Sequence, residues 1–201
     1  MIIIGYSGHA YVVCSIINGS GQTVTAYCDQ EEKSLNPFKL RYLGKEDDPA
    51  ALEALSTSPF FVAIGNNLIR RKVQESLAIK TLVPSNAIHP SAIMCASAAV
   101  APDGVMIGAR VVIQPLANIG TGSICNTGCI IEHECSLGEF VHVGPGAILC
   151  GNVTVGENTF IGAGAVVRQG IRIGKNCMIG AGSAVIKDVP DFSTVVGVPA
   201  R

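Results

Sequence analysis

Residues 143–167 read VGPGAILCGNVTVGENTFIGAGAVV, and an aliphatic side chain recurs in them at every sixth position. A period of six is neither the 3.6-residue period of an α-helix nor the two-residue alternation of a strand. It is typical of a parallel β-helix, a prism in which three short sides make one coil of about 18 residues. Stepping by six in both directions finds the repeat unbroken at Ile107, Ile113, Ile119, Cys125, Ile131, Leu137, Val143, Leu149, Val155, Ile161, Val167, Ile173, Ile179 and Val185.

The residues around each repeated aliphatic are also patterned. A small or branched residue lies two positions before it, and glycine often follows it directly. We expect the small residue to let the chain turn a tight corner, and the glycine to relieve backbone strain there. Residues 85–201 are therefore predicted to form the β-helix with a C-terminal tail. Five cysteines occupy small or inward positions of the repeat and are predicted only to pack: Cys95, Cys125, Cys129, Cys135 and Cys177.

The six-residue period is absent from residues 1–84. Apolar runs near residues 1–4, 23–28 and 59–64 are predicted strands, and helical patterns follow the first and the third. This alternation predicts a small parallel sheet with crossover helices, which is a Rossmann-like domain. Ligands of such sheets bind at the carboxyl ends of the strands, and here those ends carry the segments GYSGH, CDQ and GNN.

The GYSGH loop, residues 5–9, places glycines at a helix N-terminus, where backbone N–H groups and the helix dipole favour phosphate. The full GxGxxG spacing is missing, which favours a nucleotide-sugar over a nicotinamide cofactor and leaves a ligand-free turn as the alternative. Asp29, at the end of the second strand, could bond a ribose hydroxyl or cap its own loop.

Composition excludes several classes of function. The net charge is −1 and no run of lysine and arginine is present, so nucleic acid is not an expected partner. No apolar run approaches the roughly 20 residues that cross a bilayer. The segment MIIIGYSGHA is interpreted as a strand rather than a signal peptide. The eight cysteines are then expected to be reduced thiols in a cytoplasmic protein.

Ionisable residues gather in the stretch IEHECSLGEFVHV, residues 131–143. If Ile131 points inward, then Glu132, His133 and Glu134 turn a corner onto the outside of the prism. A solvated surface is one explanation, but the equivalent corners carry mostly glycine, amides or small residues. A histidine beside a carboxylate is the usual group for proton transfer near neutral pH. His133 is therefore a candidate general base.

Two further residues are placed relative to His133 by the length of a coil. Gly151 is expected beside His133 on the next coil, where its N–H could donate to an oxyanion. His142 lies half a coil from His133, so the two side chains should leave nearly opposite sides of one prism. If both histidines act, the active site must lie in a cleft between protomers. A trimer is the expected assembly.

Two other kinds of site are alternatives to a histidine base. A metal could recruit His133, His142 and His89, but only four histidines exist and one of them is in the other domain. A cysteine nucleophile would be Cys135 or Cys150, but Cys135 is predicted to point inward. A group can also pass directly from donor to acceptor with the help of a general base, and such a reaction needs no covalent enzyme intermediate.

Motifs along nearly the whole chain resemble the sugar O/N-acetyltransferases: GYSGH, FFVAIGNNLIRRK, HPSA, IEHECSLGEFVHVGPGAILCGNV and VVGVPAR. This group includes the sialic acid O-acetyltransferases and, more similar, the bacterial UDP-4-amino-sugar N-acetyltransferases that make diacetylated bacillosamine. The resemblance implies a left-handed parallel β-helix, a homotrimer and direct transfer from acetyl-CoA to the 4-amino group of a UDP-sugar, with no metal. O-acetylation of sialic acid or of another nucleotide-sugar hydroxyl is the alternative. A nucleotide-sugar-binding regulatory module is a third hypothesis, of another class.

The resemblance also implies roles for residues. His133 matches the general base and Glu134 its acidic partner. From the coil geometry, we expect the Gly151 N–H, with His142 of the next subunit, to stabilise the oxyanion. Acetyl-CoA is implied to lie along the prism between subunits, near His142, Gly151, Ala163 and Ala181. The implied substrate-binding residues are Ser7, Gly8, His9, Asp29, Gly65, Asn66 and Asn126. The family often has a second acidic residue after Asp29, where this chain has Gln30, and Ala163 and Ala181 are matched by position only.

Overall fold

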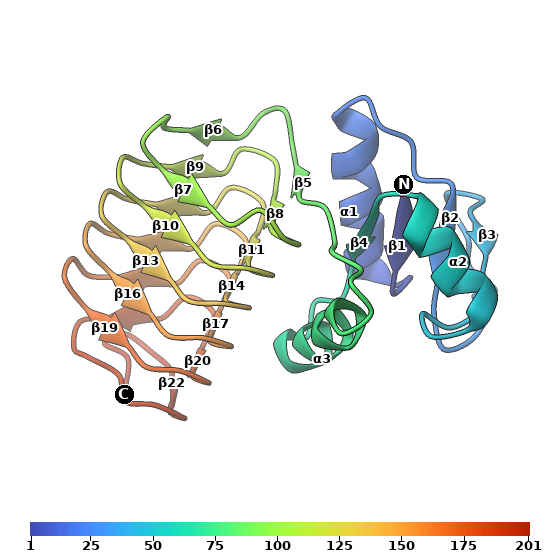
Figure 1. The fold of residues 1–201 in the computed structure, drawn as a ribbon. Helices are drawn as coiled ribbons and strands as arrows, with labels where there is room; N and C mark the ends of the chain where they lie inside the picture. The colour runs from blue at the N-terminus through green and yellow to red at the C-terminus, as the bar shows by residue number, and fades with distance from the viewer.

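The computed structural model describes residues 1–201, in which an α/β part packs against a long β-helix (Figure 1). Four parallel strands form the N-terminal sheet in the order β3-β2-β1-β4, with three helices around it. The elements are β1 (Ile2–Ile4), α1 (Gly8–Gly19), β2 (Ala26–Cys28), β3 (Arg41–Tyr42), α2 (Pro49–Thr57), β4 (Phe60–Val62) and α3 (Asn67–Ala78). The predicted parallel sheet and its two helices are present, and the structure adds β3 and α2.

Strand β1 separates two small cores, because its successive side chains point to opposite faces of the sheet. Ile3 packs with α1, and Ile2 and Ile4 pack with α2. The core around Ile3 continues into the β-helix through Met106 and Ile124, so the sheet is joined to the β-helix by apolar packing.

The β-helix consists of three parallel sheets that share one interior. The docked sheet, which faces the N-terminal part, contains β5 (Ala87–Ile88), β8 (Met106–Ile107), β11 (Ile124–Cys125), β14 (His142–Val143), β17 (Phe160–Ile161), β20 (Met178–Ile179) and β22 (Thr194–Val195). The apolar sheet contains β6 (Ile93–Met94), β9 (Val112–Ile113), β12 (Ile130–Ile131), β15 (Ile148–Leu149), β18 (Val166–Val167) and β21 (Ala184–Val185). The polar sheet contains β7 (Ala99–Val100), β10 (Asn118–Ile119), β13 (Ser136–Leu137), β16 (Thr154–Val155) and β19 (Arg172–Ile173).

The repeated aliphatics fill the interior as predicted. Ile131, Leu137 and Val143, one from each sheet, are all buried in the same core cluster. Strands one coil apart pair in register, as Ile131 does with Leu149. Cys125, Cys129, Cys135 and Cys177 are buried as predicted, whereas Cys95 is half-buried.

The role predicted for the repeat glycines is wrong. The backbone positions with positive φ are other residues, spaced six apart, and they include Glu134 (φ 62°) and Phe140 (φ 55°). Gly138, which follows an inward aliphatic, has no positive φ. Its missing side chain matters because a Cβ there would lie 2.8 Å from the backbone nitrogen of Glu157 on the next coil. These glycines therefore permit close stacking of the coils rather than the turn itself.

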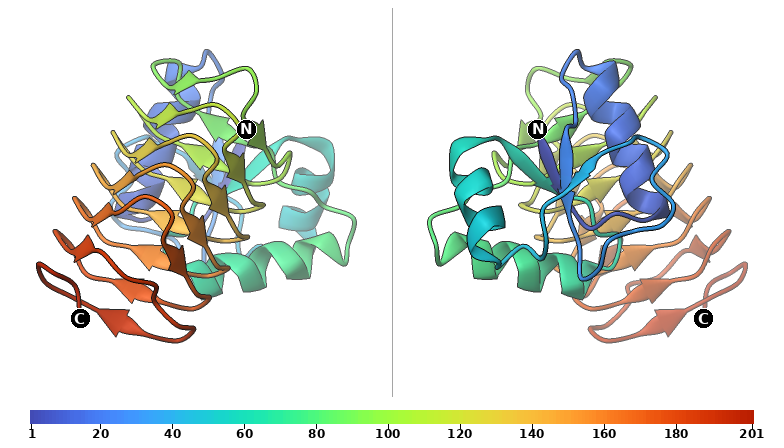
Figure 2. Two further views of the ribbon diagram at one scale, coloured as in Figure 1. Left: turned by 90° about the vertical axis from the view of Figure 1, so that its left-hand side faces the viewer. Right: turned by 90° about the vertical axis from the view of Figure 1, so that its right-hand side faces the viewer.

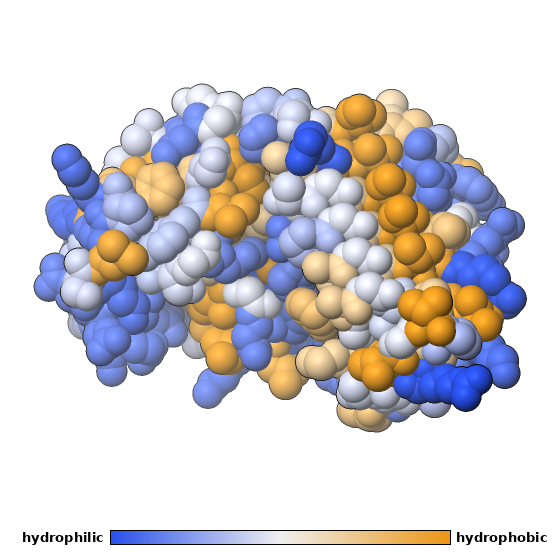
Figure 3. Space-filling model, turned by 180° about the vertical axis from the view of Figure 1, so that it is seen from behind, coloured by the Kyte–Doolittle hydropathy of each residue, from blue (hydrophilic) through white to orange (hydrophobic).

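The outward faces of the three sheets differ in chemistry. On the apolar sheet, the first residues of paired strands form a continuous ladder: Ile93, Val112, Ile130, Ile148, Val166 and Ala184. Figure 3 shows a column of apolar side chains running along the β-helix. The polar sheet presents Asn118, Ser136, Thr154 and Arg172 in the same register.

Helix α3 joins the two parts along one corner of the β-helix (Figure 2). The Asn67 amide donates to the carbonyls of Asn158 and Thr159, at 3.0 and 3.2 Å. Arg70, one helical turn later, donates to the carbonyls of Gly122 and Phe140. The helix thus crosses successive coils. None of the helices has the length and apolar character that a bilayer crossing requires.

Candidate active site

His133 and Glu134 form a hydrogen-bonded pair on the corner between the apolar and polar sheets. The imidazole Nδ1 lies 3.0 Å from Glu134 Oε2, and the two side chains are 50% and 57% exposed. A carboxylate only accepts, so Nδ1 carries the proton that is shared with Glu134 and Nε2 of the neutral ring keeps a free lone pair. The ring therefore presents a base to solvent, with a carboxylate placed to stabilise the imidazolium.

Gly151 lies under the His133 ring, one coil further along the β-helix. A Cβ at Gly151 would fall onto the ring of His133, so only glycine fits beneath it in this arrangement. Gly151 is buried beneath the ring, and its N–H has no backbone acceptor within the chain. The predicted neighbourhood of base and N–H donor is present in the structure.

His142 lies in a different place, between the docked sheet and the N-terminal part of its own chain. It is 7% exposed, and its ring stands edge-on to Phe160 with the centroids 4.9 Å apart. Its Nδ1 lies 3.3 Å from the Gly65 carbonyl, and its Nε2 lies 3.2 Å from Nδ2 of Asn126. Asn126 and Gly65, which are far apart in the sequence, meet at this histidine.

These contacts determine the tautomer of His142. A carbonyl only accepts, so Nδ1–H must donate to Gly65. The Asn126 side-chain oxygen accepts from the Thr127 N–H at 2.8 Å, which turns the amide nitrogen towards Nε2. Nε2 therefore accepts, and His142 has no free N–H for an oxyanion. The expected oxyanion role of His142 does not fit this geometry.

The surroundings of His142 hold it neutral. Burial, and then the positive charge of Arg70, lower the pKa of His142 to about 4. The same two causes lower the pKa of His9 to about 4. The His9 ring lies 6.0 Å from that of His142 by centroids, and its buried Nε2 has no hydrogen-bond partner. Two neutral imidazoles thus face one another beside Gly65.

The N-terminal loop keeps its donors available at the start of α1. Ser7 is the N-cap residue but makes no side-chain cap bond, and both Ser7 and Gly8 are exposed. Asp29 is occupied: it accepts from the backbone N–H groups of Tyr6 and Gln30, at 2.8 and 2.7 Å, and it lies 3.2 Å from Lys33. Of the two roles considered for Asp29, the loop cap is the one that these contacts show.

Asn66 also has a structural task, since its side-chain oxygen accepts from the Ile69 N–H and caps α3. Gly65 and Asn66 border a cavity of about 460 Å³ between α3 and the lower part of the docked sheet. Phe160 and Met178 form part of the opposite wall.

The remaining predicted residues lie elsewhere. Ala163 and Ala181 are exposed on successive coils, at the corner that follows the docked sheet. Within one chain, the structure does not bring them to Gly151, which lies on the corner that follows the apolar sheet. The candidate residues thus form separate groups on one chain, as expected if a site is completed by a neighbour.

The two rival sites gain no support from the geometry. No group of three or more metal-ligating side chains is close enough together to hold a metal ion. Cys135 is buried, its thiol donates to the Cys150 carbonyl, and burial raises its pKa, so it is a poor nucleophile.

Sequence reasoning missed Arg70, which is fully buried between the two parts of the chain. In the segment LIRRK it looks like an ordinary surface arginine. The structure reverses the usual pattern: Asn67, Arg70 and Gln74 are buried, whereas Leu68 and Ile69 are more than half exposed. No feature of the sequence distinguished the buried arginine from Arg71 beside it.

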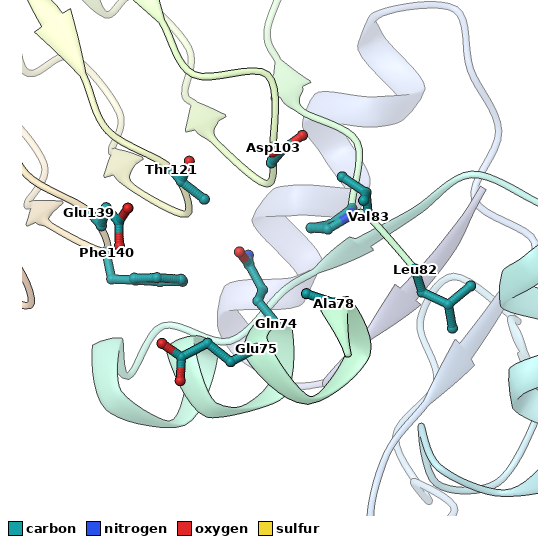
Figure 4. A pocket seen from close by; sticks show the side chains of 10 residues that line it. Gln74, Glu75, Ala78, Leu82, Val83, Asp103, Thr121, Glu139 and Phe140 are labelled. Carbon is teal, nitrogen blue, oxygen red and sulfur yellow. The ribbon is translucent and has the colours of Figure 1, made fainter. Parts of the chain in front are cut away.

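A smaller cavity of about 190 Å³ lies between α3 and the corners that carry Asp103, Thr121 and Glu139 (Figure 4). Gln74 lines it, and its Nε2 is buried without a partner. Neither His133 nor His142 borders this cavity, so it is separate from the candidate site.

Two family models match parts of the chain. Residues 1–77 match the PglD N-terminal domain, and residues 134–169 and 152–187 match the bacterial transferase hexapeptide (six repeats). The fold and site thus define a hexapeptide-repeat transferase with an added N-terminal domain.

Solved structures match along the whole chain. PerB from Caulobacter crescentus, in complex with CoA and GDP-perosamine, is 38% identical with a TM-score of 0.91, covering 100% of this chain and 95% of that one. The acetyltransferase domain of PglB from Neisseria gonorrhoeae, in complex with acetyl coenzyme A, is 32% identical with a TM-score of 0.89, covering 100% and 97%. The predicted left-handed β-helix class is confirmed.

Two curated relatives match over shorter stretches. A GDP-perosamine N-acetyltransferase of Escherichia coli O157:H7 is 35% identical over 94 residues, which are 44% of this chain and 39% of that protein. A UDP-N-acetylbacillosamine N-acetyltransferase of Bacillus subtilis (strain 168) is 38% identical over 107 residues, 52% of this chain and 50% of that protein. The chain thus matches half or less of the length of these relatives. By its full-length likeness to the solved structures, it belongs to the family of sugar N-acetyltransferases.

Proposed function

We propose that this protein transfers an acetyl group from acetyl-CoA to the amino group of a nucleotide-linked amino-sugar. The observation that carries the proposal is the His133 ring, which is bonded through Nδ1 to Glu134 and lies over Gly151 on the next coil. A base, its carboxylate and an N–H donor are what direct acyl transfer requires. Residues 1–84 bind the nucleotide-sugar, and residues 85–201 carry the transfer.

The chemistry is a direct displacement in a ternary complex. The sugar amine attacks the thioester carbon, and a C–N bond forms as the carbonyl becomes an oxyanion. His133 Nε2 takes a proton from the amine, and Glu134 stabilises the imidazolium. The Gly151 N–H donates to the oxyanion. When the C–S bond breaks, the departing thiolate receives the proton from His133, which restores the neutral base.

For the acceptor we propose the 4-amino group of a UDP-linked sugar of the bacillosamine type. The relatives act on both GDP- and UDP-linked sugars by their names, and both are N-acetyltransferases. This favours an amine over the hydroxyl of a sialic acid. We assign Ser7 and Gly8 to the phosphates, where the open start of α1 supplies N–H donors. His9, Gly65 and Asn126 lie together near the sugar. Asp29 and Asn66 contribute to binding mainly by fixing the backbone of the loop after β1 and of the start of α3.

We further propose a homotrimer with the active sites between protomers. The apolar ladder of the apolar sheet is an unpartnered surface of the kind that oligomers bury. His133 lies on the corner that directly follows this sheet, so packing through the ladder carries it to a neighbour. In this assembly the acetyl-CoA would run between subunits past Ala163, Ala181 and Gly151. Its acetyl end would lie near His142. The eight free cysteines are consistent with a cytoplasmic location.

Thiol release from acetyl-CoA tests the proposal directly, using a panel of UDP-amino-sugars, GDP-perosamine and free and CMP-linked sialic acid. We expect release only with amino-sugars, and most rapidly with a UDP-linked 4-amino-sugar. Release with sialic acid alone would instead support the O-acetyltransferase. Calorimetry that detects nucleotide-sugar binding but no acetyl-CoA binding would overturn the enzyme assignment in favour of a regulatory module.

A further inference from the structure

Arg70 is a buried cation at the centre of the contact between the two parts of the chain. Its side chain is fully buried, and all five N–H groups have acceptors. Nε donates to the Gly122 carbonyl at 2.7 Å, and one terminal nitrogen donates to Phe140 and to the Asn67 side chain, at 3.1 and 3.0 Å. The other terminal nitrogen donates to the carbonyls of Ile64 and Gly65, at 3.0 and 3.1 Å.

No carboxylate neutralises this charge. The five ion pairs of the structure do not include Arg70, and its acceptors are carbonyl and amide oxygens. Burial accordingly lowers the pKa of Arg70 to about 9. A buried charge without a counter-ion is costly to desolvate, and the hydrogen bonds of Arg70 offset this cost. Removing the side chain would leave its five acceptors without these donors, so Arg70 both carries a charge and holds the two parts of the chain together.

The position of Arg70 links it to the candidate site. The Gly65 carbonyl that accepts from Arg70 also accepts from Nδ1 of His142 at 3.3 Å. Because a carbonyl oxygen has two lone pairs, it can serve both donors at once. The guanidinium holds this carbonyl from one side while its other branches hold the β-helix at Gly122 and Phe140. The carbonyl is thereby fixed relative to the strand that carries His142.

We propose that Arg70 is a positioning residue for acetyl transfer: it fixes the Gly65 carbonyl against the β-helix, which keeps His142 in one tautomer, with Nε2 facing Asn126 beside the bound amino-sugar. The inference rests on the proposed function for its kinetic consequences. The state of the His142 ring is independent of that function. Arg70 touches no reacting atom and acts only through Gly65 and His142.

Arg70→Lys and Arg70→Met test this, with Arg71→Met as the matched control. Lysine keeps the positive charge, but its single ammonium group cannot donate to acceptors in both parts of the chain as the planar guanidinium does. Methionine removes the charge as well. Arg71 is the next residue of α3 and also contacts the β-helix, through a partly buried ion pair with Glu157 at 2.8 Å. Its loss removes an interdomain contact without touching Gly65.

The first measurement is the ring ¹⁵N spectrum of the four histidines, with His142 assigned by its absence from a His142→Gln variant. In the wild type and in Arg71→Met, we expect His142 to be protonated on Nδ1 alone. In both Arg70 variants we expect mixed tautomers. A single Nδ1–H tautomer in folded Arg70→Lys or Arg70→Met would overturn the proposal. Thermal unfolding of all variants shows which are folded, and Arg70→Lys keeps the test valid if methionine is not tolerated.

The second measurement separates KM from kcat in the acetyl-transfer assay. We expect the KM for the amino-sugar to rise about 10- to 100-fold in Arg70→Lys, because small displacements of positioning groups have effects of that size. The KM for acetyl-CoA should stay within about twofold. Equal losses for both substrates, matched by Arg71→Met, would reduce Arg70 to a structural contact. Absence of transfer by the wild type would overturn the proposed function, while the ¹⁵N result would still decide the role of Arg70.

Discussion

His133 Nε2 lies 2.5 Å from the point that a Cβ of Gly151 would occupy, although the two residues are on different coils. The stacking of coils thus brings the base next to a residue whose N–H is unpaired. Because the register is set by the whole β-helix, the backbones that carry the two residues are held in place by the core beneath them.

Gly151→Ala should displace the His133 ring while the fold persists, because the added methyl meets an exposed side chain and not the core. We expect kcat to fall at least about tenfold, since misplacement of a reacting group by a fraction of an ångström has large effects. Thiol-release kinetics measure the change. The control is the same substitution in a His133→Ala background, where no further loss should occur. An equal loss in both backgrounds would show that the methyl acts elsewhere.

His133→Ala should lower kcat by about 100- to 10,000-fold, the usual contribution of a general base. The side chain is half exposed, so the melting temperature should change little. His89→Ala is a suitable control, since His89 bonds only to Ser91 outside the candidate site. Wild-type turnover in folded His133→Ala would contradict the mechanism.

Glu134→Gln should have a smaller effect, of about 10- to 100-fold in kcat, as is typical when the partner that orients a histidine is changed. Glutamine can still accept from Nδ1–H, but it carries no charge to stabilise the imidazolium. Glu132→Gln, at the same corner but without a bond to His133, should leave kcat within about twofold. The ratio of kcat in Glu134→Gln to kcat in Glu132→Gln shows whether the carboxylate bonded to His133 takes part in catalysis.

The two histidines beside Gly65, the half-buried His9 and the buried His142, predict a pH dependence of stability. The folded-state pKa of His9 and of His142 is about 4, below the usual unfolded value of about 6.5. Below about pH 6.5 the unfolded chain binds more protons, so the free energy of unfolding decreases as the pH falls towards 4. Each histidine contributes at most about 3 kcal/mol at neutral pH, and this is lost in that window.

Urea denaturation at pH 7 and pH 4.5, at one protein concentration, measures this loss. The double variant His9→Asn/His142→Gln should be markedly less sensitive to pH over the same range. A wild type that is equally stable at both values would show that these rings are not held neutral.

The fold was predictable because the six-residue period is carried by many independent positions, from Ile107 to Val185. The neighbourhood of His133 and Gly151 followed from the coil length alone. Strand β3 and helix α2 were missed because a two-residue strand and a short helix carry little periodic signal. The function of the glycines was misassigned, because sequence spacing does not reveal which atom of the next coil a Cβ would meet.

The contact between the two parts of the chain could not be predicted. It is made by polar residues of α3, Asn67, Arg70 and Gln74, while Leu68 and Ile69 remain exposed. Amphipathic reasoning assigns apolar residues to the buried face, and here hydrogen bonds to corner carbonyls override that rule. His142 was placed on the correct side of the β-helix, but its burial under Gly65 depends on this contact.

The turns of helix α3 and the stacked corners beside it repeat at nearly equal distances. An α-helix rises about 5.4 Å per turn and neighbouring strands are about 4.8 Å apart, so one turn of α3 is about as long as the step from one coil to the next. Asn67 therefore reaches the Asn158 corner, Arg70 the Phe140 and Gly122 corners, and Gln74 lies beside Gly104. Polar side chains one turn apart on α3 can therefore each bond to a different coil, which ties the N-terminal part to several coils at once.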